Sequence, residues 1–355
     1  MYPRRSTANR RRHGSVDRQG DCRRQSSPLR QTQQLNENVT KESSSRSGTG
    51  PGTGCYLNID KPQGWTSTDV VRKLKGVTRS KKIGHGGTLD PIATGVLPVC
   101  IGPATRFADT VLLGTKSYRI TIELGRSTDT YDLSGQTTAE ADWTGVSREQ
   151  VVGVLENFRG EFEQVPPMYS AIHHNGKRLY ELARQGIEVE RPARPVEVLN
   201  LQLVDFSAPQ IVLDLECSHG FYARTLAHDI GEKLETHAHL TGLVRTHAGV
   251  FRIEDAVTLE QVIAEAESGD WRDLAMPIDA TLQHLGRITL NTMFVEMVQH
   301  GRPLSIADVG VKGETGAYDP GDRIRAYTPE GELLAILIFE PERFGWRPEK
   351  VLAAL

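Results

Sequence analysis

The stretch KKIGHGGTLDPIATGVLPVCIGPATR, residues 81–106, decides how the rest of the chain is interpreted. It passes through three glycines around His85, reaches Asp90, and ends in the apolar run from Val96 to Ile101. Glycines let the backbone approach a ligand closely, and Pro91 keeps Asp90 out of the helical region. A glycine-rich loop with one carboxylate and one imidazole, followed by a predicted buried strand, is typical of an active-site loop.

The same residues also fit an ordinary loop, in which the aspartate before a proline forms an Asx-type hydrogen bond. The segment contains neither GxxxxGK[ST] nor a GxGxxG that opens a helix, so it matches no phosphate-binding pattern. From the residues alone, the stretch yields a candidate carboxylate but does not name a reaction.

A comparison over longer blocks of the sequence indicates a protein family. GHGGTLDPIATGVLPVCIGPATR resembles the signature of the TruB family of tRNA pseudouridine synthases, which reads approximately GHTGTLDPxATGVLPxxxGxATK. Four further blocks follow in the family's order: NIDKPQGWTS (58–67), YRITIELGRSTDTYDLSG (118–135), VPPMYSAIHHNGKRLYELARQGIEVERPAR (165–194) and CSHGFYARTLAHDIGEKL (217–234). Together these blocks cover most of the chain from residue 55 onward.

The resemblance implies an α+β protein with the pseudouridine synthase fold, a central mixed, mainly antiparallel sheet flanked by helices. We expect a basic tail at 1–52, a catalytic domain at 53–283 with a thumb-like insertion at 162–194, and a β-rich, PUA-like RNA-binding domain at 284–355. Residues 118–124 and 210–217 alternate apolar and polar side chains, which independently predicts half-buried strands. The segment 147–158 carries apolar residues at helical spacing, which predicts a helix that Ser147 caps.

The family chemistry implies three catalytic residues in this chain. Asp90 would be the nucleophile, and Tyr118 would pack on the target uracil and help remove its C5 proton. Arg224 lies at the start of a predicted helix, where a positive charge is unfavourable unless a carboxylate forms an ion pair with it. The family partner of that arginine is Asp90, which it would keep ionised.

Further residues match family positions that bind the substrate. His85 would fill the space left by a flipped-out base, and Tyr222 and Leu243 would line the pocket. Lys61 lies in a Lys-Pro turn near the active-site loop. Phosphate contacts from the thumb are expected from Lys177 and Arg178, with Arg184 beside them. Without the resemblance, a surface lysine or a core tyrosine would be the default interpretation.

The reaction implied by the resemblance needs no cofactor, since pseudouridine is an isomer of uridine. We predict no metal site, because the pair His173-His174 lacks an evident third ligand. The four cysteines form no CxxC pair, which suits a reducing cytosol, and no apolar run is long enough to cross a bilayer. The expected partner is the T-arm of tRNA, with a monomeric cytoplasmic enzyme and no obligate protein partner.

Charge is distributed unevenly along the chain. Residues 1–52 hold eleven basic and four acidic residues, a balance of +7, so the remaining residues balance at −10. The tail is too polar to order itself. It could be a solvated arm, a nonspecific RNA-binding arm, a transit peptide or the product of an over-extended start site. The net negative charge of the residues after 52 does not by itself indicate RNA binding.

The sequence departs from the family pattern in a few places near the expected RNA. Gly86 replaces the usual threonine, which should loosen the loop, and His219 replaces a lysine. Val244 precedes Arg245 where the family has two arginines, and His247 occupies another commonly basic position. We therefore expect weaker or more salt-sensitive tRNA binding with the chemistry retained.

Two other functions remain open. The chain could be a tRNA-folding chaperone with weak or no catalysis, or a guide-dependent synthase that acts on ribosomal RNA within a ribonucleoprotein. Intact Asp90, Tyr118 and Arg224 favour an enzyme, and the thumb-like insertion and short C-terminal module favour a stand-alone tRNA enzyme.

Overall fold

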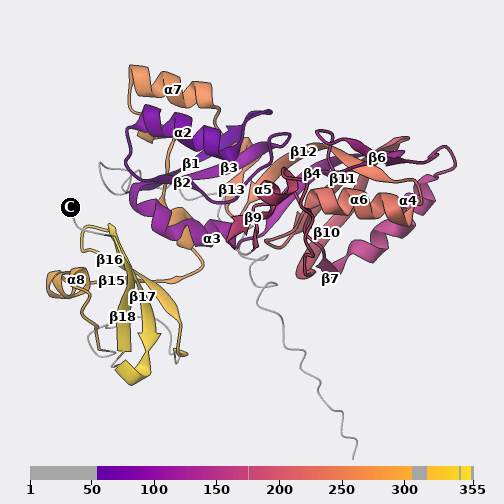
Figure 1. Cartoon of the computed structure of the whole chain (residues 1–355). Helices are drawn as coiled ribbons and strands as arrows, with labels where there is room; N and C mark the ends of the chain where they lie inside the picture. Colours follow the sequence, from indigo (N-terminus) through magenta and orange to yellow (C-terminus); the bar gives the residue numbers. More distant parts are fainter. Residues whose placement is uncertain (1–53, 175, 306–317, 344, 353–355) are drawn as a thin grey trace, which may run out of the picture. The chain divides into compact units, whose positions relative to one another are not determined.

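One large mixed sheet organises the residues that precede the C-terminal module (Figure 1). The computed structural model describes residues 54–174, 176–305, 318–343 and 345–352, so the expected tail at 1–52 lies outside the described residues. The strand order is β14-β1-β3-β12-β4-β11-β10-β7, with β2 added at β3 and β13 at β12. Its strands are β1 (Cys55–Lys61), β2 (Ile83–His85), β3 (Thr94–Ile101), β4 (Lys116–Leu124), β7 (Gly160–Gln164), β10 (Arg194–Ser207), β11 (Gln210–Cys217), β12 (Ala238–Ala248), β13 (Phe251–Arg252) and β14 (Met276–Pro277). Its pairings are antiparallel except that of β3 with β12, which confirms the predicted mixed, mainly antiparallel sheet.

Helices flank this sheet, and their ends carry the expected caps. Ser147 caps α4 in a capping box with Gln150, as its position before the apolar pattern predicted. Thr66 caps α2 in the same way with Asp69. The α-helices are α2 (Ser67–Thr78), α3 (Ala108–Leu112), α4 (Arg148–Leu155), α5 (Leu179–Ala183), α6 (Ala223–Lys233), α7 (Leu259–Ser268) and α8 (Thr292–Gln299). The 3-10 helices are η2 (Gly102–Phe107), η3 (Glu156–Phe158), η4 (Ile253–Asp255), η5 (Trp271–Leu274), η6 (Ile278–Leu282) and η7 (Pro341–Arg343).

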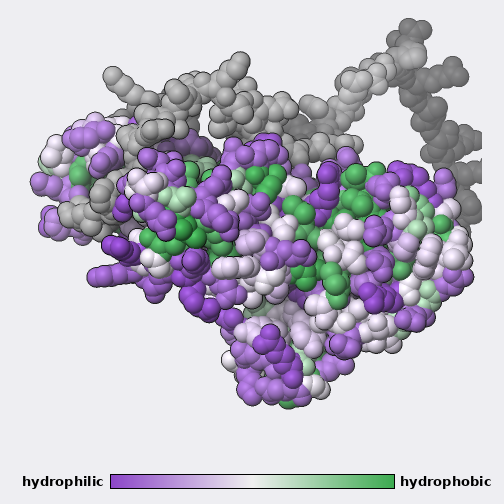
Figure 2. Space-filling view, turned by 90° about the horizontal axis from the view of Figure 1, so that it is seen from above, coloured by the Kyte–Doolittle hydropathy of each residue, from purple (hydrophilic) through white to green (hydrophobic). Residues whose placement is uncertain are grey.

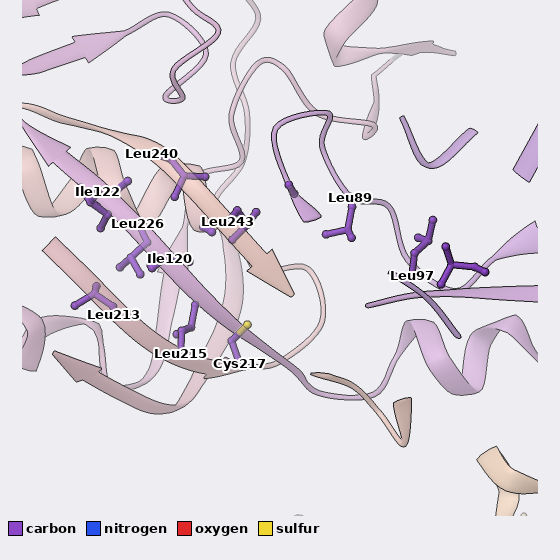
Figure 3. Packing of buried hydrophobic residues seen from close by; sticks show 14 of the residues in the cluster. Leu89, Leu97, Ile120, Ile122, Leu213, Leu215, Cys217, Leu226, Leu240 and Leu243 are labelled. Atoms are coloured by element: carbon purple, nitrogen blue, oxygen red, sulfur yellow. The ribbon is translucent and has the colours of Figure 1, made fainter. Parts of the chain in front are cut away.

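The main core lies between the central strands and α6. Alternate residues of β4 and β11 point into it, among them Ile120, Ile122, Leu213 and Leu215, and Leu226 of α6 belongs to the same cluster (Figure 3). Each such fully buried aliphatic side chain contributes about 1.5–3 kcal/mol of burial free energy. This packing fixes the register of α6, whose first turn carries Arg224.

The thumb-like insertion connects the end of β7 to the start of β10, which pair with each other in the sheet. Gln164 lies opposite Arg194 in that pairing, so the chain departs from the sheet at residues 165–193. Within this segment, β8 (His173–His174) and β9 (Lys177–Arg178) form a short hairpin that leads into α5. Another hairpin, of β5 (Arg126–Thr128) and β6 (Thr137–Glu140), follows β4.

The C-terminal module has a sheet of its own, in the order β15-β16-β17-β18. Its strands are β15 (Gly286–Thr289), β16 (Arg323–Tyr327), β17 (Leu333–Glu340) and β18 (Gly345–Val351). Fully buried Trp346 packs edge-on against Tyr318, with ring centroids 4.8 Å apart. It also packs against Phe339 in a tilted arrangement, with ring centroids 5.1 Å apart. The predicted β-rich C-terminal region is therefore confirmed.

Exposed apolar side chains do not form one continuous band on the face shown in Figure 2, where hydrophobic residues occur in several separate areas. Leu112, Leu113 and Val250 are among the exposed ones. None of the helices in the described residues is long and apolar enough to cross a membrane.

The structure corrects one expectation for the active-site loop. Gly86 was expected to loosen it, but a Cβ placed there would lie 2.7 Å from Cγ1 of Val111 and 2.8 Å from its Cβ. Both residues are buried, so α3 packs directly against the loop backbone. Gly86 thus permits a close contact where a threonine would collide.

We therefore predict that Gly86→Thr destabilises the fold by roughly 1–3 kcal/mol through overpacking. Val111→Ala removes the nearer colliding atom, so the double variant should lose less stability than the sum of the two single variants. Urea unfolding of all four proteins measures this coupling. Strictly additive losses would show that the two residues do not interact.

A second prediction concerns Asp229 in α6. Burial, with Glu232 nearby, raises the pKa of this carboxyl to about 6, so the folded protein holds this proton more tightly than the unfolded chain. Stability is therefore lost as the pH rises from about 4 to 6. Asp229→Asn should stabilise the protein by roughly 1–2 kcal/mol at neutral pH, after allowance for solvent screening, and the gain should vanish near pH 4.

Asp142 provides a control of opposite sign. Hydrogen bonds from the backbone N–H and hydroxyl of Thr144 lower the pKa of its carboxyl, so Asp142→Asn should weaken the fold at neutral pH. Denaturant unfolding at both pH values compares the two variants. An Asp229→Asn gain that persists unchanged at low pH would contradict the prediction.

Candidate active site

The loop that carries Asp90 is anchored on both sides of that residue. The hydroxyl of Ser67, at the start of α2, donates to the Leu89 carbonyl at 3.1 Å and accepts from the Leu89 N–H at 2.8 Å. On the other side, the N–H of Gly64 donates to the carbonyl of Pro91 at 2.8 Å. The Lys-Pro turn and the α2 N-terminus therefore position Asp90 through its two neighbours.

Asp90 forms an ion pair with Arg224. Nε of Arg224 lies 2.9 Å from Oδ2 of Asp90, and Nη2 donates to Oδ1 at 3.3 Å. The Asp90 side chain is 33% exposed and that of Arg224 is 6% exposed, so the carboxylate can be reached while the guanidinium is enclosed. The remaining donors of Arg224 bond to the carbonyls of Tyr169, at 2.8 Å, and Thr130, at 3.3 Å.

A second carboxylate, missed by the sequence analysis, stands beside Arg224. Oδ2 of Asp132 lies 3.8 Å from Nη1 of Arg224, and the Asp132 side chain is 5% exposed. Its Oδ1 accepts hydrogen bonds from the hydroxyls of Thr130 and Ser134 at 2.8 Å and 2.5 Å. The sequence carried a weak signal for it, since the polar stretch 128–135 is part of the family resemblance.

The turn that holds Asp132 is itself fixed to α6. Tyr131 has a positive φ of 61°, which is uncommon for a bulky residue. Its ring stacks on the imidazole of His228, one turn after Arg224, with centroids 4.0 Å apart and planes at 6°. The helix thus supports both Arg224 and the backbone that surrounds it.

Competing effects set the charge of Asp90. Burial raises the pKa of its carboxyl, and the Asp132 carboxylate adds to that rise, whereas Arg224 and Lys61 oppose it. Because Arg224 makes two contacts with the carboxylate, the ionised form is the one that this geometry stabilises.

The central strands bring other predicted residues to the same place. β12 pairs with β4 on one side and with β3 on the other, so Arg245 lies opposite Tyr118 in one pairing and Gly95 in the other. Burial raises the pKa of the Tyr118 phenol, and Asp90 is close enough to add to that effect. Leu243 is 7% exposed and belongs to the same core cluster as Leu89 (Figure 3).

Two basic residues lie beside this loop, the half-buried His85 and the fully buried Lys61. Burial lowers the pKa of His85, and the charge of Arg245 adds to the effect, so its imidazole is neutral at neutral pH. Lys61 is fully buried, and its Nζ donates to the carbonyls of Pro62 at 2.9 Å and Trp65 at 2.6 Å. Burial lowers its pKa to about 8, and in this conformation its ammonium holds the turn.

Tyr222 immediately precedes α6 and is positioned by its backbone. The side-chain amide of Gln164 accepts from the Tyr222 N–H at 2.8 Å and donates to the Tyr222 carbonyl at 3.1 Å. Burial raises the pKa of its phenol, and the charge of Asp90 adds to that rise, so the phenol lies within electrostatic reach of the site.

The basic residues of the thumb form a separate group. Lys177 and Arg178 are exposed in β9, and no described contact joins them to Asp90. The guanidinium carbons of Arg178 and Arg184 lie 6.0 Å and 5.4 Å from the ring centroid of Tyr180. This group combines positive charge with an aromatic ring.

The departures from the family pattern differ in their surroundings. His219 and Val244 are exposed, with Val244 at 36%, so both alter the surface. Burial lowers the pKa of His247, which removes its charge at neutral pH. Arg245, in contrast, is buried. Among the described residues, no three His, Cys, Asp or Glu side chains are arranged to hold a metal ion.

Comparisons with known proteins indicate the family of the chain. Residues 75–223 match the N-terminal domain of TruB family pseudouridylate synthase, and residues 224–283 match the tRNA pseudouridylate synthase B C-terminal domain. The chain is 46% identical to tRNA pseudouridine synthase B of Syntrophomonas wolfei, with 79% of this chain and 92% of the relative covered. It is 42% identical to the protein of that name from Geobacter sulfurreducens, over 76% and 88%.

A solved structure supports the fold. A chain in the crystal structure of a Cbf5–Nop10–Gar1 complex superimposes with a TM-score of 0.63 at 27% identity, with 84% of each chain covered. Since both the sequence relatives and the domain matches extend across the anchored loop, the strands and α6, the chain belongs to the TruB family of pseudouridine synthases.

Proposed function

We propose that this protein converts uridine 55 in the T-arm of tRNA to pseudouridine, with Asp90 as the nucleophile. The observation that carries the proposal is the Asp90–Arg224 ion pair at 2.9 Å, in a loop anchored on both sides of the aspartate. The relatives named tRNA pseudouridine synthase B support tRNA as the substrate class.

The reaction is balanced without a cofactor. The C1′–N1 bond breaks and its electron pair leaves with the uracil, while the Asp90 carboxylate bonds to C1′, as carboxylates do in retaining glycosidases. The uracil then turns, and C5 replaces Asp90 at C1′. C5 loses one proton and N1 gains one, so the product has the composition of the substrate.

Asp90 must be ionised when it attacks C1′, and it becomes a carboxylate again when C5 displaces it. Arg224 supplies the stabilising charge, and Asp132 restrains Arg224 from its other side. The partial exposure of Asp90 lets a ribose reach it while the enclosed guanidinium stays in place.

The target base must leave the folded RNA loop, which costs a few kcal/mol of stacking. Tyr118 of β4, whose phenol lies within electrostatic reach of Asp90, would stack on the uracil and help to take up the C5 proton. Tyr222 and Leu243 would line the pocket, and the neutral His85 would occupy the space that the base vacates.

The thumb would hold the RNA backbone. Exposed Lys177, Arg178 and Arg184 provide charges for phosphates, which position an RNA without reading its sequence. The ring of Tyr180, bracketed by two arginines, would support them and could stack on an unpaired base.

Two observations favour a stand-alone catalyst over the other functions. The Asp90–Arg224 geometry has no purpose in a pure tRNA chaperone, which argues for chemistry. The guide-dependent alternative would place the chain in a ribonucleoprotein. The similar Cbf5 chain, at 27% identity, was crystallised in a complex with Nop10 and Gar1, but relatives with higher identity carry the tRNA enzyme name. We further propose a cytoplasmic monomer without an obligate protein partner, whose catalytic domain spans 53–283 and whose RNA-binding module spans 284–355.

Replacing the nucleophile tests the proposal directly. Asp90→Ala should lower the single-turnover rate of pseudouridine formation at position 55 of an unmodified tRNA transcript by at least about 10,000-fold, since binding alone leaves little catalysis. Asp214→Ala is the matched control, because it removes an aspartate that pairs with Arg119 on the sheet surface, and it should retain the wild-type rate. Product formation by Asp90→Ala would refute the assignment. Tight tRNA binding without product from the wild type would favour the chaperone.

Asp132→Asn tests the second carboxylate. The Asn side chain can still accept the turn's hydrogen bonds, but it removes the negative charge that faces Arg224, so the rate should fall by about 10–100-fold through misplacement of the guanidinium. Because Asp132 raises the pKa of Asp90, the acid limb of the pH–rate profile should move to lower pH. A profile with an unchanged limb and an unchanged rate would contradict this role.

A further inference from the structure

Arg245 is a buried cation at the centre of the sheet. It is 1% exposed, and its Nε and Nη2 donate to the carbonyls of Val96 at 2.6 Å and Gly87 at 3.1 Å. Within residues 54–174, 176–305, 318–343 and 345–352, no Asp or Glu forms an ion pair with it. A buried charge without a counterion costs several kcal/mol unless its other interactions offset that loss.

The two carbonyls that Arg245 binds stand on either side of Asp90 in the chain. Gly87 lies before the aspartate, in the glycine-rich turn, and Val96 lies after it, in β3. The donors of a guanidinium have a fixed planar geometry. One side chain therefore sets the spacing between the two ends of the Asp90 loop.

The backbone of Arg245 is also held closely. Gly95, with φ of 93°, approaches so near that a Cβ would lie 2.3 Å from the Arg245 carbonyl oxygen. On the other side, Arg245 lies opposite Tyr118 in the pairing of β12 with β4. Arg245 thus joins the strand that follows Asp90 to the strand that carries Tyr118.

The charge of Arg245 acts on three groups around the site. Burial raises the pKa of Tyr118, and the charge and hydrogen bonding of Arg245 oppose that rise. Burial lowers the pKa of Lys61 to about 8, and Arg245 contributes to the lowering. The same charge helps to keep His85 neutral.

We propose that Arg245 is a positioning residue of the reaction, which fixes the Asp90 loop and the Tyr118 phenol relative to each other and supplies positive charge between them. This inference rests on the proposed function. The competing interpretation is a cation that only joins β3 to β12 and stabilises the fold.

Lys116 offers a matched control for the purely structural interpretation. It is 6% exposed in β4, two residues before Tyr118, and its Nζ also binds carbonyls, those of Gly114 at 2.6 Å, Val111 at 3.2 Å and Leu112. Burial and then the charge of Arg245 lower the pKa of Lys116 to about 8, but the charge of Lys116 is not among the causes that shift the pKa values of Lys61, Tyr118 or His85. Its loss should therefore weaken the fold without changing the chemistry.

The experiment compares the full-length wild type, Arg245→Gln, Arg245→Lys and Lys116→Met. For each we would measure thermal unfolding, tRNA affinity, and the single-turnover rate of pseudouridine formation from pH 6 to pH 9.5 on an unmodified tRNA transcript. Arg245→Lys keeps the positive charge but cannot bind the carbonyls of Val96 and Gly87 with two donors of one planar group. It therefore distinguishes the effect of positioning from the effect of charge, even if Arg245→Gln fails to fold.

We expect Arg245→Gln to lose about 100-fold in rate, the effect of a misplacement near 1 Å, without a comparable loss of tRNA affinity. In the wild type, loss of the Lys61 ammonium proton near pH 8 should release the Lys-Pro turn beside Asp90 and give the rate profile a basic limb. Removal of the Arg245 charge raises the pKa of Lys61, so this limb should move to higher pH. Arg245→Lys should lower the single-turnover rate but leave the pH of the basic limb unchanged. Lys116→Met should lose stability while both the rate and the limb stay unchanged.

Two results would overturn the inference. One is a wild-type rate in either Arg245 variant; the other is the same loss of stability and rate in the Arg245 variants and in Lys116→Met. Failure of the proposed function is a separate outcome, because the wild type itself would then form no pseudouridine.

Discussion

The Asp90–Arg224 ion pair is the constraint on which the rest of the catalytic region depends. The enclosed arginine begins α6, so the helix must bring a charge into the protein at the end where its dipole is unfavourable. The carboxylates of Asp90 and Asp132 and the carbonyls of Thr130 and Tyr169 surround that charge. Segments far apart in sequence meet here, and each supplies part of what the guanidinium requires.

The sheet topology makes this meeting possible. The parallel pairing of β3 with β12 places the strand that follows the Asp90 loop beside the strand that carries Leu243 and Arg245. Antiparallel pairing of β12 with β4 then adds Tyr118. Gly95 permits the first pairing at close range because any side chain would collide with the Arg245 carbonyl. The site is therefore a product of three central strands as much as of one loop.

Sequence alone predicted the parts of this arrangement that are local. The apolar alternation of 118–124 and 210–217 and the cap at Ser147 follow from spacing within one element, and all match the observed elements. The unfavourable position of Arg224 even indicated that a carboxylate should face it. The catalytic roles came from the family resemblance and stay proposals.

Contacts between distant segments could not be predicted in this way. The collision between a residue 86 side chain and Val111 depends on how α3 packs, and it reverses the expectation that Gly86 loosens the loop. Asp132 lay within a polar stretch that could equally have been solvated, and no spacing rule ties it to Arg224. The burial of Lys61 and Arg245 depends on strand order, which a linear pattern does not contain.

The distribution of charge explains how an acidic chain body can serve an RNA substrate. Residues 53–355 balance at −10, yet the candidate site is flanked by Lys61 and Arg245, whose described hydrogen bonds go to backbone carbonyls and not to carboxylates. Carbonyls supply partial charges and leave the net positive charge in place. In a buried, low-dielectric region such charges act strongly over short distances. The field at the candidate site is thus set by a few buried charges, and net composition is a poor guide to it.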